Sequence, residues 1–244
     1  MAIQKEFDSL IKNDVWDIVD LPEGRKAIGS KWVFKRKRDA DGNVERHKAR
    51  LVAQGFTQKS GIDYDETFCP VVRFESIKLI IALAAKYNLQ LHQVDITTAF
   101  LNGELEEDIF MKQPERYEIK GKEHMVCKLK RSIYGLKQSP RCWNQALDKH
   151  LKKMGFKSST NDPCIYTQNS GGEVSILAVY VDDIVLAGKS TKKIQQIIKE
   201  IADKFVVRDM GKLYHFLGVK VRQERDTLQM VEFGLVNKHT SERF

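Results

Sequence analysis

The sequence predicts an α+β fold centred on a split βαββαβ unit, an antiparallel sheet with two helices on one face. One observation behind this prediction is a long apolar run that contains Asp182 and Asp183 near its middle, which indicates two strands folded at the acidic pair. Another is the order in which strand-like and helix-like patterns follow one another along the chain. The other face of the sheet is expected to form a cleft floor. The elements are expected at 91–96 (strand), 139–154 (helix), 174–188 (two strands), 190 onward (helix), and 205–207 and 217–221 (strands).

The two helices of this unit have local signals of their own. Ser139 can cap the first helix, Pro140 suits its first position, and Gly155 can end it. The second helix begins near Ser190 or Thr191 and has isoleucines at helical spacing, which predict one apolar face against the sheet. These isoleucines are Ile194, Ile197, Ile198 and Ile201.

The N-terminal part of the chain shows a helical stripe at 2–12 and a buried helix at 75–88. Between them lie two extended, basic runs, at 32–38 and 44–53. The residues that separate the runs, Asp-Ala-Asp-Gly-Asn at 39–43, have strong turn chemistry. The sequence therefore predicts a basic β-hairpin in this region.

Positive charge is concentrated in two places. The 244-residue chain has a formal net charge of +8. Lys and Arg gather in residues 31–50 and again in residues 120–141. Two local basic patches suggest a polyanionic partner, although a pair of solvated basic loops would have the same composition.

Other classes of protein are disfavoured by the composition. The four cysteines form no CxxC pair and have no His-x₃₋₅-His beside them, so free buried thiols are expected rather than zinc or disulfides. They are Cys69, Cys127, Cys142 and Cys164. The apolar runs are too short to span a bilayer, and no signal peptide precedes them, so an intracellular, soluble protein is expected.

Three carboxylates are the candidates for chemistry. Asp182 and Asp183 lie in the apolar run SILAVYVDDIVLAG, where burial of two charges is costly unless a cation compensates. Asp95 ends the strand at 91–96. Each has a simpler explanation, a hairpin turn for the pair and a helix cap for Asp95. In a βαββαβ sheet, however, the two strands can be central neighbours, and the three carboxylates would then suit two Mg²⁺ ions that catalyse phosphoryl transfer.

The sequence resembles the reverse transcriptase domain of copia-type LTR retrotransposons. Six stretches carry the resemblance in family order, across about residues 14–230. They are IGSKWVFKRK, KARLVAQGFTQKSGIDYDETFCPVVR, QVDITTAFLNGELEEDIFMKQPE, LKRSIYGLKQSPRCWN, YVDDIVLAG and YHFLGVKV. The YVDD stretch is a weak signal by itself, but the six together are specific.

The resemblance implies a role for each matching residue. Asp95 corresponds to the first catalytic aspartate of the polymerase palm. Asp182 and Asp183 correspond to the catalytic YxDD pair, with Asp182 the firmer metal ligand. Phe100 falls at the position of the aromatic sugar gate, where a large ring would clash with a ribose 2′-hydroxyl. Its alternative role is core packing.

The resemblance also implies contacts with the substrate. Gln138 lies in the segment that faces template and nucleotide. Lys35, Lys48 and Arg50 lie on the basic hairpin, where the family contacts the incoming triphosphate. Which of the three touches phosphate is left open, since the alignment with the family across the turn is ambiguous. The alternative is that these basic residues simply face solvent.

The implied architecture is that of a right-handed polymerase. Residues 14–90 would be mainly fingers, with the basic hairpin at 31–53, and residues 91–222 mainly palm with fingers insertions. Residues 223–244 would be a truncated, divergent tail, so that the thumb is truncated or absent. The resemblance implies two Mg²⁺ ions, with Mn²⁺ as an alternative. It implies RNA or DNA template–primer and dNTPs as partners, no membrane, and a cytoplasmic virus-like particle as the location.

Two functions from different classes are consistent with the sequence. The first is an RNA-directed DNA polymerase core, part of a retrotransposon Pol polyprotein, and the three aspartates favour it. The second is a catalytically inactive nucleic-acid-binding remnant of a decayed element, which the expected lack of a thumb favours. An RNA-synthesising viral polymerase is disfavoured by Phe100 and by the copia-like motifs.

Overall fold

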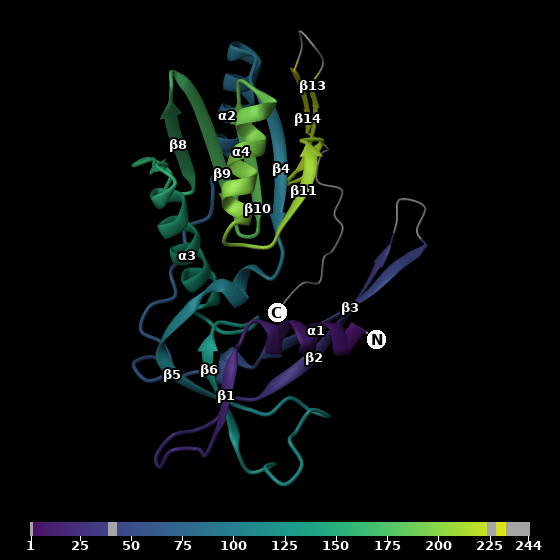
Figure 1. Cartoon of the computed structure of the whole chain (residues 1–244), viewed down its shortest axis with the longest axis vertical. Coiled ribbons are helices and arrows are strands. Elements are labelled where there is room, and N and C mark those ends of the chain that lie inside the picture. The colour runs from purple at the N-terminus through teal and green to yellow at the C-terminus, as the bar shows by residue number, and fades with distance from the viewer. Residues whose placement is uncertain (1, 39–42, 224–227, 233–244) are drawn as a thin grey trace. The chain divides into compact units, whose positions relative to one another are not determined.

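The computed structural model describes residues 2–38, 43–223 and 228–232, and the chain forms two compact units. Unit 1 comprises residues 1–69 and 100–146, and unit 2 comprises residues 70–99 and 147–244. The assignment of residues 14–90 mainly to fingers and of residues 91–222 mainly to palm stays a prediction, and the helix before residue 90 packs within unit 2. Figure 1 labels the elements of both units.

Unit 2 contains a six-stranded antiparallel sheet in the order β11-β4-β10-β9-β8-β7. The first four strands have the order of a βαββαβ unit, which confirms that part of the predicted fold. Strands β8 and β7, which extend the sheet, were not predicted. The elements are α2 (Phe74–Tyr87), β4 (Gln90–Ile96), α3 (Ser139–Lys153, shared with unit 1), β7 (Lys157–Ser158), β8 (Ile165–Ser170), β9 (Glu173–Tyr180), β10 (Asp183–Gly188), α4 (Thr191–Ala202), β11 (Val207–Lys212), β12 (His215–Phe216), β13 (Val219–Gln223) and β14 (Leu228–Glu232).

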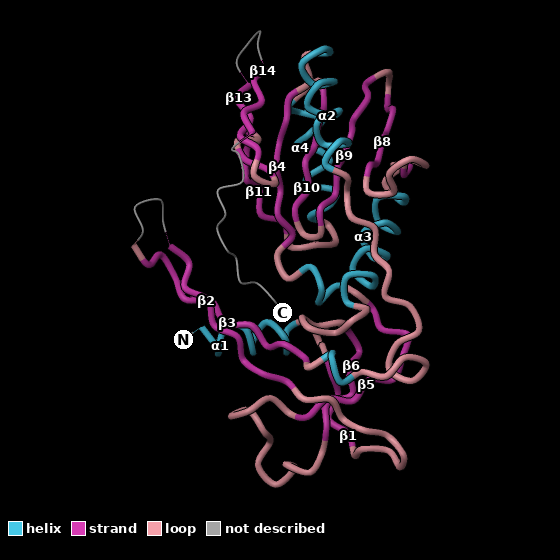
Figure 2. Tube along the Cα trace, turned by 180° about the vertical axis from the view of Figure 1, so that it is seen from behind, coloured by secondary structure: helices cyan, strands magenta, loops and turns pink. Residues whose placement is uncertain are grey.

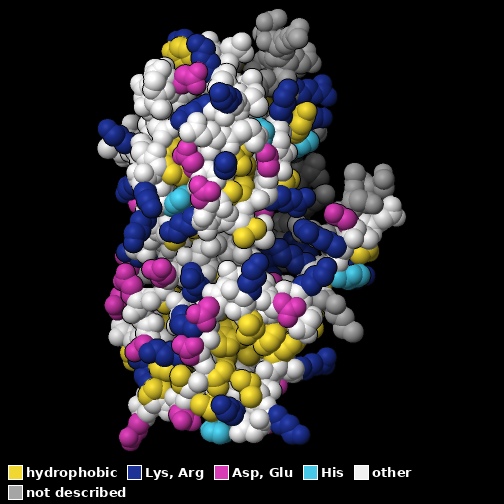
Figure 3. Space-filling model, in the orientation of Figure 1, with side chains coloured by type: hydrophobic (Ala, Val, Ile, Leu, Met, Phe, Trp, Pro, Cys, Tyr) yellow, Lys and Arg dark blue, Asp and Glu magenta, His cyan; other side chains and the backbone are white. Residues whose placement is uncertain are grey.

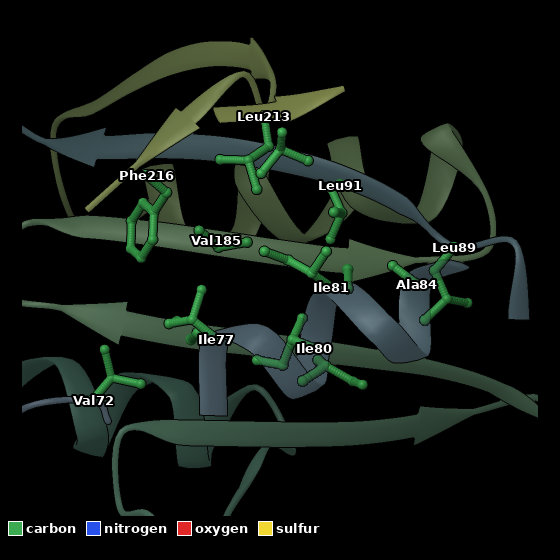
Figure 4. Packing of buried hydrophobic residues seen from close by; sticks show 14 of the residues in the cluster. Val72, Ile77, Ile80, Ile81, Ala84, Leu89, Leu91, Val185, Leu213 and Phe216 are labelled. Atoms are coloured by element: carbon green, nitrogen blue, oxygen red, sulfur yellow. The ribbon is translucent and has the colours of Figure 1, made fainter. Parts of the chain in front are cut away.

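Helices lie on both faces of this sheet, because α2, which is not one of the two helices predicted for the βαββαβ unit, covers the face that was expected to be free. On one face, Ile194 of α4 packs over Gly188, where an added Cβ would meet its side chain at 3.1 Å. On the other face, α2 packs its buried isoleucines against residues such as Leu91 and Val185, as Figure 4 shows. Figure 1 shows α4 in front of the strands, and Figure 2, seen from the opposite side, shows α2 in front of them. The part of that face near Asp183 is only half-buried.

The helix ends agree in part with their sequence signals. Ser190 caps α4 by accepting a hydrogen bond from the Lys193 backbone N–H, at 3.2 Å. Gly155 ends α3 with a φ of +89°, a conformation that favours glycine. Ser139 does not cap α3 as expected, because its hydroxyl donates to the Ile133 carbonyl at 2.5 Å.

The start of α2 is instead capped from a distant segment. The Asp162 carboxylate is buried and accepts hydrogen bonds from the Arg73 backbone N–H (3.0 Å) and the Ser76 hydroxyl (2.6 Å). Its other oxygen accepts from the Cys164 N–H at 3.1 Å. Burial alone would raise the pKa of Asp162, but these hydrogen bonds outweigh it and lower the pKa. One carboxylate therefore joins α2 to the segment before β8.

Unit 1 has its own apolar core, in which Leu10, Leu51, Ile109 and Leu129 are almost fully buried. The predicted basic hairpin is present as β2 and β3, and its turn at 39–42 lies outside the described residues. The elements are α1 (Ala2–Lys12), β1 (Trp16–Val19), β2 (Ser30–Arg38), β3 (Val44–Ala53), the 3-10 turns η1 (Gly55–Thr57) and η2 (Ala99–Asn102, shared with unit 2), β5 (Glu104–Lys112) and β6 (Val126–Arg131). Strands β1, β6 and β5 form a three-stranded sheet.

The cysteines are free thiols, as expected. Three are buried and Cys69 is half-buried. Burial raises the pKa of Cys127 to about 12 and, with help from Glu107, that of Cys142 to about 11, so both thiols are held protonated and unreactive. Within the described ranges, no helix combines the length and the apolar character needed to cross a membrane.

We predict that Asp162→Ala lowers the free energy of unfolding by about 1–3 kcal/mol, because it leaves buried donors unsatisfied. Urea denaturation measures this cost. Since the folded pKa is lowered, the contribution is complete above the unfolded pKa of about 3.9 and is lost as the pH falls through the folded value. The cost should therefore shrink in strong acid. Asp65→Ala, at an exposed loop position, should change stability by less than about 0.5 kcal/mol; an equal loss in both variants would contradict the capping role.

Candidate active site

The acidic pair lies at the turn between two central strands of unit 2. Tyr180 ends β9 and pairs with Asp183, the first residue of β10, so Val181 and Asp182 form a two-residue turn. Val181 has a φ of +53°, a left-handed conformation that costs a β-branched residue free energy. The predicted hairpin at the acidic pair is confirmed, and its tip is strained.

Pairing of β10 with β4 brings Asp95 to this turn. Asp183 lies directly opposite Asp95 in the antiparallel register, and the Ile96 N–H donates to the Asp182 carbonyl at 2.7 Å. Residues directly opposite each other on adjacent strands have side chains on the same face of the sheet, with Cβ atoms roughly 4.5–5.5 Å apart. Two of the three predicted aspartates are therefore register neighbours, and Asp182 is the residue next to them.

The Asp183 carboxyl is partly removed from water. Burial raises its pKa, and the neighbouring Asp182 and Asp95 raise it further. The Gln93 side-chain amide opposes them by donating to the Asp183 carboxylate at 3.2 Å. Because other carboxylates lie nearby, ionisation of Asp183 is costly. A cation bound beside these carboxylates would stabilise their charged forms.

Two polar residues at this end of the sheet were not singled out by the sequence analysis. Gln93 precedes Asp95 by two residues, so the period-two alternation of a strand could have placed it on the same face. Arg208 of β11 lies directly opposite Asp95 in the register, also on that face. No sequence signal identified Arg208, because its position depends on the pairing of β11 with β4.

The side chains at this end of the sheet are of the kind that binds divalent metals, but they do not form a complete metal site. Within the described ranges, no three His, Cys, Asp or Glu side chains lie together closely enough to hold a metal ion. The donors at this end of the sheet are carboxylate oxygens, which Mg²⁺ and Mn²⁺ prefer. The assignment of Asp95, Asp182 and Asp183 as metal ligands stays a prediction.

The predicted phosphate-binding residues lie on one face of the hairpin in unit 1. Lys35 is directly opposite Lys48, and Arg50, two residues further along β3, is opposite Val33. A cleft of about 460 Å³ is lined by Phe34, Lys35, Arg36, His47 and Lys48. Figure 3 shows Lys and Arg side chains gathered along this hairpin. A basic surface is therefore present where the sequence predicts it.

Phe100 and Gln138 have different surroundings from those expected. Phe100 is half-buried in a single 3-10 turn rather than at the start of a helix, and its ring meets that of Tyr134 edge-on at 4.9 Å. Gln138 is 1% exposed, and its amide donates to the Asp63 carbonyl (2.8 Å) and accepts from Gln58 (3.0 Å). These hydrogen bonds hold its amide inside unit 1, and the expected contact of Gln138 with nucleotide stays a prediction.

The remaining expectation concerns both units. The sequence predicts that the hairpin at 31–53 and the basic segment at 120–141 border the same cleft as the aspartates. The hairpin and the segment belong to unit 1, and the aspartates belong to unit 2. A shared cleft stays a prediction.

Comparison with known proteins agrees with the family resemblance seen in the sequence. The family model described as "Reverse transcriptase (RNA-dependent DNA polymerase)" matches residues 13–242. The chain is similar to the Retrovirus-related Pol polyprotein from transposon TNT 1-94 of Nicotiana tabacum, with 44% identity over 94% of the chain and 17% of that polyprotein. It is 36% identical to the Pol polyprotein from transposon RE1 of Arabidopsis thaliana, over 91% of the chain and 15% of the polyprotein. With the Transposon Ty1-ER2 Gag-Pol polyprotein of Saccharomyces cerevisiae it shares 29% identity over 98% of the chain and 14% of the polyprotein.

The chain belongs to the reverse transcriptase (RNA-dependent DNA polymerase) family. Its relatives named above are Pol polyproteins of copia-type retrotransposons, which confirms the resemblance seen in the sequence. The chain spans 14–17% of the length of these three polyproteins.

We predict that Val181→Gly raises the free energy of unfolding by about 0.5–1 kcal/mol, because relief of the left-handed strain exceeds the entropic cost of glycine. Urea denaturation of the metal-free chain measures the change. The matched control is Val206→Gly, at an exposed valine without a left-handed φ, which should lose roughly 0.5–1 kcal/mol. If both variants lost stability equally, the turn would not be strained.

Proposed function

We propose that this chain is the core of an RNA-directed DNA polymerase that extends a primer with dNTPs. The observation that carries the proposal is the pairing of Asp183 with Asp95 beside Asp182 at one end of the sheet. Membership of the reverse transcriptase family supports it. On this reading unit 2 provides the palm, and the hairpin of unit 1 belongs to the fingers.

Asp95, Asp182 and Asp183 would hold two Mg²⁺ ions, or Mn²⁺ in their place. Such a pair of ions activates the primer 3′-hydroxyl and stabilises the charge of the leaving pyrophosphate. The chain contributes oxygen donors whose backbone is fixed by the β4–β10 register. Partial burial of Asp183 makes its charge depend on a cation, which favours metal binding over an empty site.

The basic face of the hairpin would bind phosphate groups. Lys35, Lys48 and Arg50 lie on that face and are suited to the triphosphate of the incoming nucleotide or to the template backbone. Binding through such contacts releases counterions, so template affinity should fall steeply with salt. The alternative function, nucleic-acid binding without polymerisation, would keep this surface and lack turnover.

The test of the proposal is primer extension by the purified chain, on an RNA template with a DNA primer, in the presence of Mg²⁺. Asp95→Asn should reduce extension by about a thousandfold, because several kcal/mol of transition-state stabilisation depend on the metal site. The control is Asp203→Asn, at an exposed residue that ends α4, which should extend like the wild type. A wild-type chain that binds primer–template but does not extend it would overturn the enzymatic proposal in favour of the binding function.

Sugar selection provides a second prediction. Phe100→Ala should lower the ratio of kcat/KM for a dNTP to that for the matching rNTP by at least about tenfold, because it removes the ring that would clash with a 2′-hydroxyl. Incorporation of each sugar is measured separately on the same primer–template. Phe56→Ala, which removes an exposed ring of the same unit, should leave the ratio unchanged. If Phe100→Ala lowered only stability, Phe100 would be a packing residue.

A further inference from the structure

The Arg50 guanidinium lies over an aromatic ring. Its central carbon is 4.5 Å from the centroid of the Tyr134 ring, a cation–π arrangement. The Nε atom of Arg50 is buried, and among the described residues it has no hydrogen-bond acceptor. A buried N–H without an acceptor is costly, and a ligand oxygen would remove that cost. The contact with Tyr134 therefore holds a guanidinium whose Nε–H has no acceptor among the described residues.

The same ring also supports Phe100. The Tyr134 and Phe100 rings meet at 66° with their centroids 4.9 Å apart, an edge-to-face geometry that is favourable for aromatic pairs. Tyr134 thus contacts two residues to which we assign different parts of one nucleotide, Arg50 for phosphate and Phe100 for the sugar. All three residues belong to unit 1.

The backbone around Tyr134 is held in place on both sides. The Tyr134 carbonyl accepts from the Ala53 N–H at 2.7 Å, which joins it to the strand that carries Arg50. Gly135 has a φ of +93°, and a Cβ there would lie 2.1 Å from the Ala53 carbonyl oxygen. On the other side, the Ser132 hydroxyl donates to the Phe100 carbonyl at 2.5 Å. The backbone that carries the ring is therefore tied to the segments that carry Arg50 and Phe100.

We propose that Tyr134 is a positioning residue of the nucleotide site, which aligns Arg50 with the triphosphate through the face of its ring and Phe100 with the 2′-position of the sugar through ring packing. The proposal rests on the proposed function. It makes the affinity for the triphosphate and the choice of sugar depend on one side chain. In the YGLKQSPR segment, the role toward the nucleotide is thereby assigned to Tyr134 instead of Gln138, because the Gln138 amide is held by internal hydrogen bonds.

Steady-state primer extension at saturating primer–template separates this role from a structural one. Tyr134→Leu should raise the KM for a dNTP by about tenfold, with a much smaller effect on kcat, since the lost cation–π contact serves binding. The dNTP/rNTP ratio of kcat/KM should fall with it. Tyr134→Phe, which keeps the ring, should restore both values. A loss of kcat alone in Tyr134→Leu, or a change of KM without a change of the sugar ratio, would overturn the proposal.

A matched control is available in the same unit. The Tyr64 ring also lies under a cation, with the Lys137 Nζ 4.7 Å from its centroid. Tyr64→Leu removes the same kind of contact from a ring whose cation is Lys137 rather than Arg50. Its KM for dNTP and its sugar ratio should stay at wild-type values. If Tyr64→Leu matched Tyr134→Leu, the effects would reflect general destabilisation and the proposal would fail.

Equilibrium binding gives a readout that does not need catalysis. The chain is bound to a primer–template whose primer ends in a dideoxynucleotide, and it is titrated calorimetrically with magnesium dATP or magnesium ATP. Tyr134→Leu should weaken dATP binding by about tenfold and reduce the preference for dATP over ATP. Wild-type preference in Tyr134→Leu, or a wild type that binds neither nucleotide, would overturn the inference. A wild type that binds dATP with this dependence on Tyr134 but extends no free primer would overturn the polymerase function alone.

Discussion

The candidate active site depends on the register between β4 and β10. Because strand side chains alternate between faces, a slip of one residue would move Asp183 to the face that α4 covers and would separate it from Asp95. The register is specified from both sides of the sheet. Ile184 and Leu186 are buried on the α4 face, whereas Val185 and Ala187 are buried against α2. Burial of apolar groups on both faces therefore determines which carboxylates are neighbours.

This arrangement puts destabilising features at the end of the sheet that carries the candidate catalytic aspartates. Asp183 is a partly buried carboxylate beside two others, and Val181 has a left-handed backbone conformation. Neither feature stabilises the metal-free fold. The apolar packing of α2 and the hydrogen bonds that Asp162 accepts at its start stabilise the unit and offset these costs. A destabilised site on a well-packed sheet is the pattern expected where function opposes stability.

In unit 1, close backbone contacts bring distant segments together, as the strand register does in unit 2. A Cβ on Gly55 would lie 2.0 Å from the Gly135 carbonyl oxygen, and a Cβ on Gly135 would be equally close to Ala53. Two segments that are distant in the sequence can therefore meet only because both positions are glycine. The contact brings the end of the basic hairpin to the loop that carries Tyr134, and the hydrogen bond from Ser132 joins this loop to Phe100.

The sequence by itself determined the elements whose signals are local. The helix at α4 was predicted from Ser190 and its isoleucine spacing, the hairpin of β9 and β10 from an apolar run broken by two aspartates, and the family from ordered motifs. Only the tertiary structure decided the rest, because it depends on pairing and packing between distant segments. Examples are the cover of α2 on the second face, the position of Arg208 opposite Asp95, the internal hydrogen bonds of Gln138, and the contact of Tyr134 with Arg50. Local patterns report the conformation of each segment, whereas the partners of a side chain are set by the register and burial of segments elsewhere in the chain.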